Sequence, residues 1–153
     1  NPPMRSLGRV PSGIYGDRRL AEGKPLPLSA EETSHLPFVL GAASDDGGEA
    51  RVRRALAAFN VSPTNILARV QFFDVIIAML DRGQAVTNMP GAMIPLDMRP
   101  RIVSLFPMHD WRLVFLRQDD SADEDRDAIE RFLLDSVVKD PAYLIVDDAT
   151  DRS

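Results

Sequence analysis

The stretch from residue 66 to residue 90 constrains the fold more than any other part of the sequence. Residues 66–71 fit a strand, residues 72–82 fit a helix that is apolar on almost every side, and residues 85–89 fit a second strand. Gly83 stands where helices commonly end on a left-handed residue. This order predicts two parallel strands joined by a right-handed crossover. We expect the helix between them to be the most buried one in the domain, because its apolar residues cover several sides.

Further helices and strands are predicted before and after residues 66–90. Residues 29–32 (Ser-Ala-Glu-Glu) have the form of a capping box, which predicts a short helix from Ala30. The first 28 residues hold five of the 12 prolines and four of the nine glycines, so little regular structure is expected there. The sequence thus predicts an α/β domain with a mainly parallel sheet flanked by helices. Its other expected elements are strands at residues 37–41, 101–106, 111–117 and 142–146, and helices at residues 49–59 and 122–138.

Composition and charge exclude several classes of protein. The 153 residues suit one globular domain, and 18 Lys and Arg against 23 Asp and Glu argue against a free-standing nucleic-acid binder. The absence of cysteine excludes disulfides, thiolate metal sites and cysteine nucleophiles, and two histidines are too few for a multi-histidine metal site. The longest apolar stretch, residues 72–80, is far shorter than the about 20 residues of a membrane span. The first residues lack the apolar core of a signal peptide, and we expect the chain to be a fragment or a trimmed form.

The motifs of common enzymes are missing from the sequence. It has no dinucleotide-binding or phosphate-binding glycine loop, no zinc-binding His-Glu-x-x-His and no nucleophile elbow. His109, Asp110 and Ser104 are the residue types of a hydrolase triad, but adjacent His and Asp side chains are poorly placed to orient each other. Asp74, near a helix start, fits a role at the helix dipole better than a catalytic one. No catalytic residue, metal site or cofactor is predicted.

The turn from strand to helix at residues 71–73 is the best candidate for a binding site. Ligands of open α/β sheets bind outside the carboxyl ends of the strands, and the first N–H groups of a helix attract anions. Gln71, Phe72 and Phe73 stand at this turn. The alternative is that the two rings belong to the core, and we expect at least one of them to do so.

From about residue 7 to residue 132, the chain resembles the later part of the effector-binding domain of LysR-type transcription regulators. Residues 8–16 and 23–25 are similar to the segment in which those domains cross between their two subdomains. Residues 34–38 (Ser-His-Leu-Pro-Phe) resemble a strand start that follows a short helix in the family.

The strongest part of the resemblance is residues 75–90. They are similar to the family's buried helix, glycine, short strand and proline, with Ala85 where a second glycine is usual. Residues 101–106, 111–117 and 129–132 then resemble the following strands and the terminal helix. The order and spacing of these segments carry the resemblance rather than any single motif.

The resemblance implies a periplasmic-binding-protein-like effector domain with one subdomain incomplete. Residues 1–28 would be the crossover and a remnant of the first subdomain. Residues 29–107 would be the second subdomain, and residues 108–153 the return strand and terminal helix of the first. The family's winged helix-turn-helix, linker helix and first half-subdomain have no counterpart in this sequence. The chain is therefore expected not to bind operator DNA by itself.

The resemblance also implies a function and a site. In the family a small molecule binds between the two subdomains and changes how a tetramer binds DNA. An organic acid would suit Gln71 and the helix N–H groups, with the phenylalanines beside an aromatic ring, although many amphiphiles would also fit. The expected partners are a small-molecule effector and further copies of the chain, in the cytoplasm and without a membrane. The implied effector-binding residues are Gly41, Gln71, Phe72, Phe73, Pro90 and Gly91.

Three other functions stay open at this point. A solute-binding protein has the same two-lobed architecture, a small α/β enzyme is a second alternative, and a plain interaction domain is a third. A helix-turn-helix in the upstream sequence would favour the regulator, and a signal peptide there would favour the solute-binding protein. A turnover assay would test for the enzyme.

Overall fold

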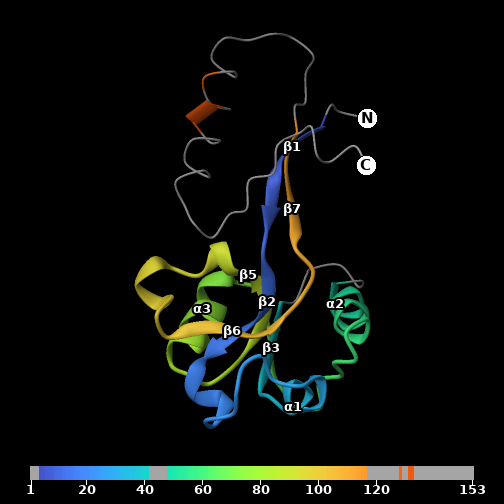
Figure 1. Cartoon of the computed structure of the whole chain (residues 1–153), viewed down its shortest axis with the longest axis vertical. Helices are drawn as coiled ribbons and strands as arrows, with labels where there is room; N and C mark the ends of the chain where they lie inside the picture. Colours follow the sequence, from blue (N-terminus) through green and yellow to red (C-terminus); the bar gives the residue numbers. More distant parts are fainter. Residues whose placement is uncertain (1–3, 42–47, 117–127, 129–130, 133–153) are drawn as a thin grey trace. The chain divides into compact units, whose positions relative to one another are not determined.

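The computed structural model describes residues 4–41, 48–116, 128, 131 and 132 (Figure 1). The chain divides into two compact units, one from Ser12 to His109 and the other made of Asn1–Pro11 and Asp110–Ser153. In the unit made of residues 1–11 and 110–153, the described strands are β1 (Met4–Val10) and β7 (Trp111–Leu116), which form an antiparallel pair. The register of this pair runs from Met4 opposite Leu116 to Val10 opposite Trp111.

The unit from Ser12 to His109 contains five strands, three α-helices and three short 3₁₀ turns among its described residues. In chain order these are β2 (Ser12–Asp17), η1 (Arg18–Ala21), α1 (Ala30–Ser34), β3 (Phe38–Gly41), α2 (Gly48–Ala57), β4 (Ile66–Val70), α3 (Phe73–Asp81), β5 (Thr87–Pro90), η2 (Gly91–Met93), η3 (Leu96–Met98) and β6 (Ile102–Pro107). The predicted strands and helices between residues 29 and 107 are thus present, with shifts of one or two residues at their ends.

The strands of this unit form a three-stranded sheet in the order β5-β2-β6 and a two-stranded sheet β3-β4, and a bridge beside β5 links the two into one layer. β3 and β4 are parallel, and Val86, just before β5, forms a parallel bridge with Phe38 of β3. β2 pairs antiparallel with both β5 and β6. The α/β class is confirmed, but the pairing is mixed rather than mainly parallel. The reason is that β2, which lies before the helical part of the chain, runs against its two neighbours.

The sheet has an apolar core on each face. Successive side chains of β3 point to opposite faces, so Phe38 packs with one cluster and Val39 with the other. Leu56 of α2 belongs to the Phe38 cluster, whereas Leu80 of α3 belongs to the Val39 cluster. Figure 1 accordingly shows α2 and α3 on opposite sides of the sheet.

α3 is less buried than its sequence predicts. Ile76 and Leu80 are buried, but Val75 is 45% exposed and Phe72, at the N-cap, is 70% exposed. The expectation of burial on several sides is therefore wrong for the described structure, because the helix meets the sheet along one side only. Gly83 has φ 69°, so the left-handed residue expected after the helix is confirmed.

The capping box before α1 is also confirmed. The Glu32 N–H donates to Ser29 Oγ at 3.0 Å, and the Ser29 N–H donates to Glu32 Oε1 at 3.0 Å. These two bonds satisfy donors that the first turn of a helix leaves without intrahelical partners.

The expectation of little regular structure before residue 29 is wrong, because β1 and β2 both lie there. Two glycines that seemed to indicate turns sit inside β2, where neighbouring elements come close. A Cβ on Gly13 would lie 2.7 Å from Ser104 Oγ, and a Cβ on Gly16 would lie 2.6 Å from Val86 Cγ1. These glycines permit close packing across the sheet, a second reason for glycine within a strand.

Some sequence predictions concern residues that the structure does not describe. Within the expected helix at residues 122–138, Ala128, Arg131 and Phe132 are helical. The rest of that helix and the strand at residues 142–146 lie outside the described residues. The division at residues 28 and 107 into parts of two subdomains stays a prediction.

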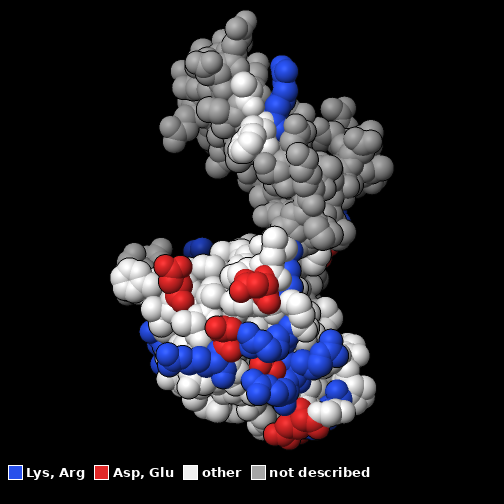
Figure 2. Space-filling view, turned by 90° about the vertical axis from the view of Figure 1, so that its left-hand side faces the viewer, with Lys and Arg blue, Asp and Glu red and all other residues white. Residues whose placement is uncertain are grey.

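A buried carboxylate ties three elements together. Asp17, whose side chain is 1% exposed, accepts hydrogen bonds from the backbone and guanidinium of Arg19 and from Arg101. Arg101 also pairs with Asp81 at the end of α3 and donates to its carbonyl. Figure 2 shows basic side chains in a band on one face, with acidic side chains among them. The network joins the end of β2 and the start of β6 to the end of α3.

We expect Ile76→Asp to lower the free energy of unfolding by about 3–5 kcal/mol, because it places an unpaired charge in the core. Val75→Asp is the matched control on the same helix, at a position that is 45% exposed, and should change it by less than about 1 kcal/mol. Urea unfolding followed by circular dichroism measures both. Equal losses in the two variants would contradict the orientation of α3.

The Asp17 network predicts a loss of stability in acid. Hydrogen bonds from Arg19 lower the pKa of Asp17 from 3.8 to about 2. A carboxylate whose pKa is lower in the folded than in the unfolded state stabilises the fold at pH values above its unfolded-state pKa. This stability is lost as the pH falls towards 2. Asp17→Asn should therefore unfold at lower urea than the parent at pH 7 and show a flatter decline between pH 4 and pH 2. Parallel pH profiles in the two proteins would show that the network contributes nothing.

Candidate functional site

Four strands of this unit, β3, β4, β5 and β6, end at the same edge, because β5 and β6 both run against β2. β3 and β4 are parallel, with Gly41 opposite Val70, and the Phe38–Val86 bridge shows that the chain entering β5 runs the same way. Neighbouring strands lie about 4.8 Å apart, so the ends of β4 and β5 are separated by roughly 10 Å, with β3 between them. The carboxyl ends of parallel strands are where open α/β sheets bind ligands. We call this the strand-end edge, defined by Gly41, residues 71–73, and residues 90 and 91.

The predicted site residues are differently exposed at this edge. Gln71 is exposed directly after β4, and Phe72 and Phe73 are 70% and 38% exposed. The expectation that at least one ring belongs to the core is therefore wrong. Gly41 is exposed, and a Cβ built on it would meet nothing within 4 Å. Pro90 is buried and pairs with Ser12, so it ends the strand rather than offering surface.

Tyr15 of β2 covers Gly91 at the end of β5. A Cβ on Gly91 would overlap the Tyr15 hydroxyl and come within 3.0 Å of Cζ, so only glycine fits beneath this ring. Burial raises the pKa of Tyr15, and the positive charge of Arg99 partly opposes that rise. The phenol therefore stays protonated at neutral pH and presents an O–H group beside Gly91. Sequence reasoning missed Tyr15 because its segment was expected to be irregular.

An ion pair also spans the strand-end edge. Arg69 of β4 stands opposite Leu40 of β3, and its Nε and Nη2 donate to Glu49 at 2.6 Å and 3.0 Å. Glu49 lies in the first turn of α2 and also accepts from Arg53 Nε at 3.1 Å. The Arg69 hydrogen bonds are the main cause that lowers the pKa of Glu49 to about 2.

Arg69 and Gln71 are two residues apart in the sequence. Arg69 thus brings a positive charge to the last residues of β4, directly before Gln71, which lies in a bend after the strand. The sequence could not show the Glu49–Arg69 pair, because its two residues lie 20 positions apart on different elements.

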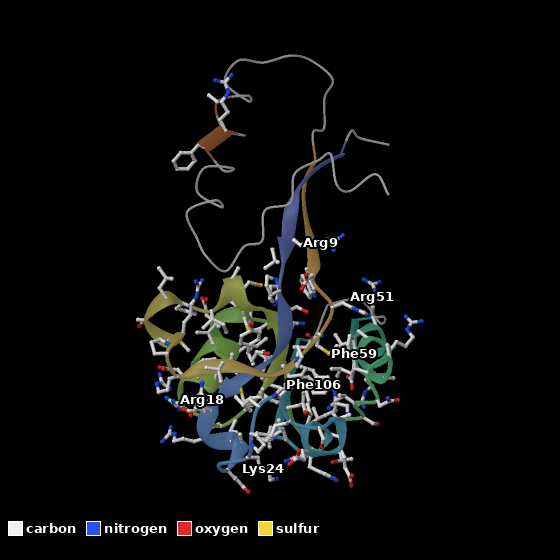
Figure 3. The ribbon with its side chains drawn as sticks, viewed as in Figure 1. Arg9, Arg18, Lys24, Arg51, Phe59 and Phe106 are labelled. Atoms are coloured by element: carbon white, nitrogen blue, oxygen red, sulfur yellow. The ribbon has the colours of Figure 1, made fainter. Side chains whose placement is uncertain are left out.

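The two histidines lie in different settings: His109 has a ring contact with Phe59, and His35 is exposed. The ring centroid of His109 lies 4.6 Å from that of Phe59, and Phe59 packs edge-on against Phe106 at 6.2 Å (Figure 3). His35 is the C-cap residue of α1. In the described part of the chain no three His, Cys, Asp or Glu side chains gather as metal ligands. No helix there has the length and apolar character needed to cross a membrane.

Gly91→Ala should lower the free energy of unfolding by about 1–3 kcal/mol, because the new methyl group forces the Tyr15 ring aside. Adding Tyr15→Phe removes the nearest clashing atom, so the double variant should lose less than the sum of the two single variants. Thermal unfolding of the four proteins measures the coupling. Additive losses would mean that Tyr15 does not lie over Gly91.

Comparisons with known proteins find solved structures with a similar fold, but no match by sequence. No family model and no curated protein matches the chain. A LysR family protein from Agrobacterium tumefaciens is similar in structure, with TM-score 0.52 and 16% identity over 88% of this chain and 63% of that one. The effector-binding domain of QuiR in complex with shikimate has TM-score 0.53 and 16% identity over 87% of this chain and 65% of that one.

The effector-binding domain of BenM with its effector benzoate is similar as well. Its TM-score is 0.56 and its identity 11%, over 95% of this chain and 69% of that one. The chain thus spans 63–69% of the length of these three domains. Further matched structures are the effector domain of the transcriptional regulator AmpR and the regulatory domain of the transcriptional activator MexT, both from Pseudomonas aeruginosa. Over most of its length, the chain has the fold of the effector-binding domains of LysR-type transcription regulators.

Proposed function

We propose that this chain is the ligand-sensing part of a LysR-type transcription regulator. It binds a small organic acid at the strand-end edge. The acid controls DNA binding by a winged helix-turn-helix that lies outside this sequence. The observation that carries the proposal is the edge itself, where a polar amide and two exposed aromatic rings follow directly on a parallel strand.

The chemistry of the edge suits a small acid with an apolar body. The Gln71 amide can both donate and accept hydrogen bonds, while Phe72 and Phe73 offer apolar walls. The Tyr15 hydroxyl beside Gly91 adds a donor on the far side of β3. Benzoate and shikimate, the ligands of the BenM and QuiR domains, are both small carboxylic acids, which supports this ligand class.

The proposed regulator works in the cytoplasm as a homo-oligomer. Exposed apolar side chains support contacts between copies, since large apolar surface favours association. On β4 Leu67 is 50% exposed, and in η3 Leu96 is 70% exposed. Ligand binding at the neighbouring strand ends is then positioned to influence how the copies meet.

Gln71→Ala should weaken binding of the acid by roughly 2- to 13-fold, because one neutral hydrogen bond contributes about 0.5–1.5 kcal/mol. His109→Ala is the comparison variant, since its ring packs on Phe59 and is not among the proposed contacts. Thermal-shift screening of small acids, beginning with benzoate and shikimate, identifies the acid. Calorimetry on the full-length protein then measures both variants. Normal binding by Gln71→Ala together with loss in His109→Ala would overturn the site and favour an enzyme.

A further inference from the structure

We propose that Arg69 receives the carboxylate of the effector and that Glu49 occupies this place in the ligand-free protein. The inference rests on the proposed function and names the ligand group that the strand-end edge recognises. Arg69 would be the specificity-determining residue for acids, and Glu49 an internal competitor for it.

The geometry of the pair is that of a bound carboxylate. Two donors of one guanidinium meet the two oxygens of Glu49, with Nε to Oε2 at 2.6 Å and Nη2 to Oε1 at 3.0 Å. This parallel arrangement is how arginine commonly recognises carboxylates, including those of ligands. The carboxylate of a small acid can make the same two bonds in its place.

The pair is also accessible to a ligand. The side chains of Arg69 and Glu49 are 53% and 33% exposed, so solvent weakens their attraction. Exposed ion pairs of this kind change an equilibrium constant by a factor of only about 1.4 to 5. Asp17, by contrast, is 1% exposed beneath its two arginines and is held as part of the structure. The Glu49 pair can therefore open at small cost, whereas the Asp17 network cannot.

Glu49 keeps a partner when it leaves Arg69. Arg53 lies one turn along α2 and already donates to Glu49 Oε1 at 3.1 Å, so the displaced carboxylate stays paired. Exchange therefore breaks the link between β4 and the first turn of α2 without leaving an unpaired acid. Binding at the edge would in this way release the start of α2, which supplies a route from the ligand to the rest of the protein.

The experiment measures benzoate and shikimate binding to the full-length protein by calorimetry, with benzamide as a neutral analogue of benzoate. Arg69→Gln should weaken binding of the acids about 10-fold, because it removes two charge-assisted hydrogen bonds. Glu49→Gln should strengthen it by about 1.4- to 5-fold, because the competitor is lost. Benzamide should respond to neither change.

Two matched controls separate direct contact from a change in net charge. Arg54→Gln removes an exposed arginine of α2, and Glu31→Gln removes an exposed acid of α1. Both should leave acid binding within about 1.5-fold of the parent. In the Arg69→Gln background, Glu49→Gln should bring no gain, since there is no guanidinium left to release.

The outcomes distinguish the two proposals. If the acids bind the parent and Arg69→Gln equally well, or if Glu49→Gln binds them more weakly, Arg69 is not their receptor although the proposed function stands. A gain from Glu49→Gln that persists without Arg69 would likewise overturn the inference. If neither acid binds the parent or Glu49→Gln, both the inference and the small-acid function fail.

Discussion

The parallel neighbours of β3 are the constraint on which the rest of the structure depends. The strand is only four residues long, yet β4 pairs with it on one side and the chain at Val86 hydrogen-bonds to it on the other. Because these three segments run the same way, their ends meet at one edge. Phe38 and Leu40 fill one core and Val39 the other, so the strand also anchors both layers of helices. Any binding site at the strand-end edge exists because this short strand is held in register from both sides.

The molecule uses ion pairs in two different ways. Asp17 is buried beneath Arg19 and Arg101, where breaking the network would leave a charge without solvent or partner. Glu49 and Arg69 meet near the surface, where water can replace either partner. The first arrangement fixes the joint between β2, β6 and α3 at the end remote from the strand-end edge. The second lies at that edge, where a pair of low cost can exchange with a ligand.

The sequence was sufficient to predict most of the individual helices and strands, but it did not predict which other parts of the chain pack against them. The capping box before α1 and the strand, helix, glycine and strand around α3 were predicted, because each has a pattern within a few residues. The strands before residue 18 were missed, because Gly13 and Gly16 indicate turns unless the close approach of Ser104 and Val86 is known. The one-sided burial of α3 and the antiparallel direction of β2 depend on neighbours far along the chain. Residues 71–73 were placed correctly at a strand end, while Tyr15 and the Glu49–Arg69 pair had no local signal.

Mapping the backbone amides that respond to an acid tests the central claim most directly. Heteronuclear NMR spectra recorded during a titration with benzoate report every amide at once. The account predicts the largest shifts at Gly41, at residues 69–73 and at Gly91, with the first turn of α2 responding as Glu49 is displaced. Shifts centred instead on Asp17 and Arg101, at the opposite end of the strands, with the strand-end edge unchanged, would contradict it.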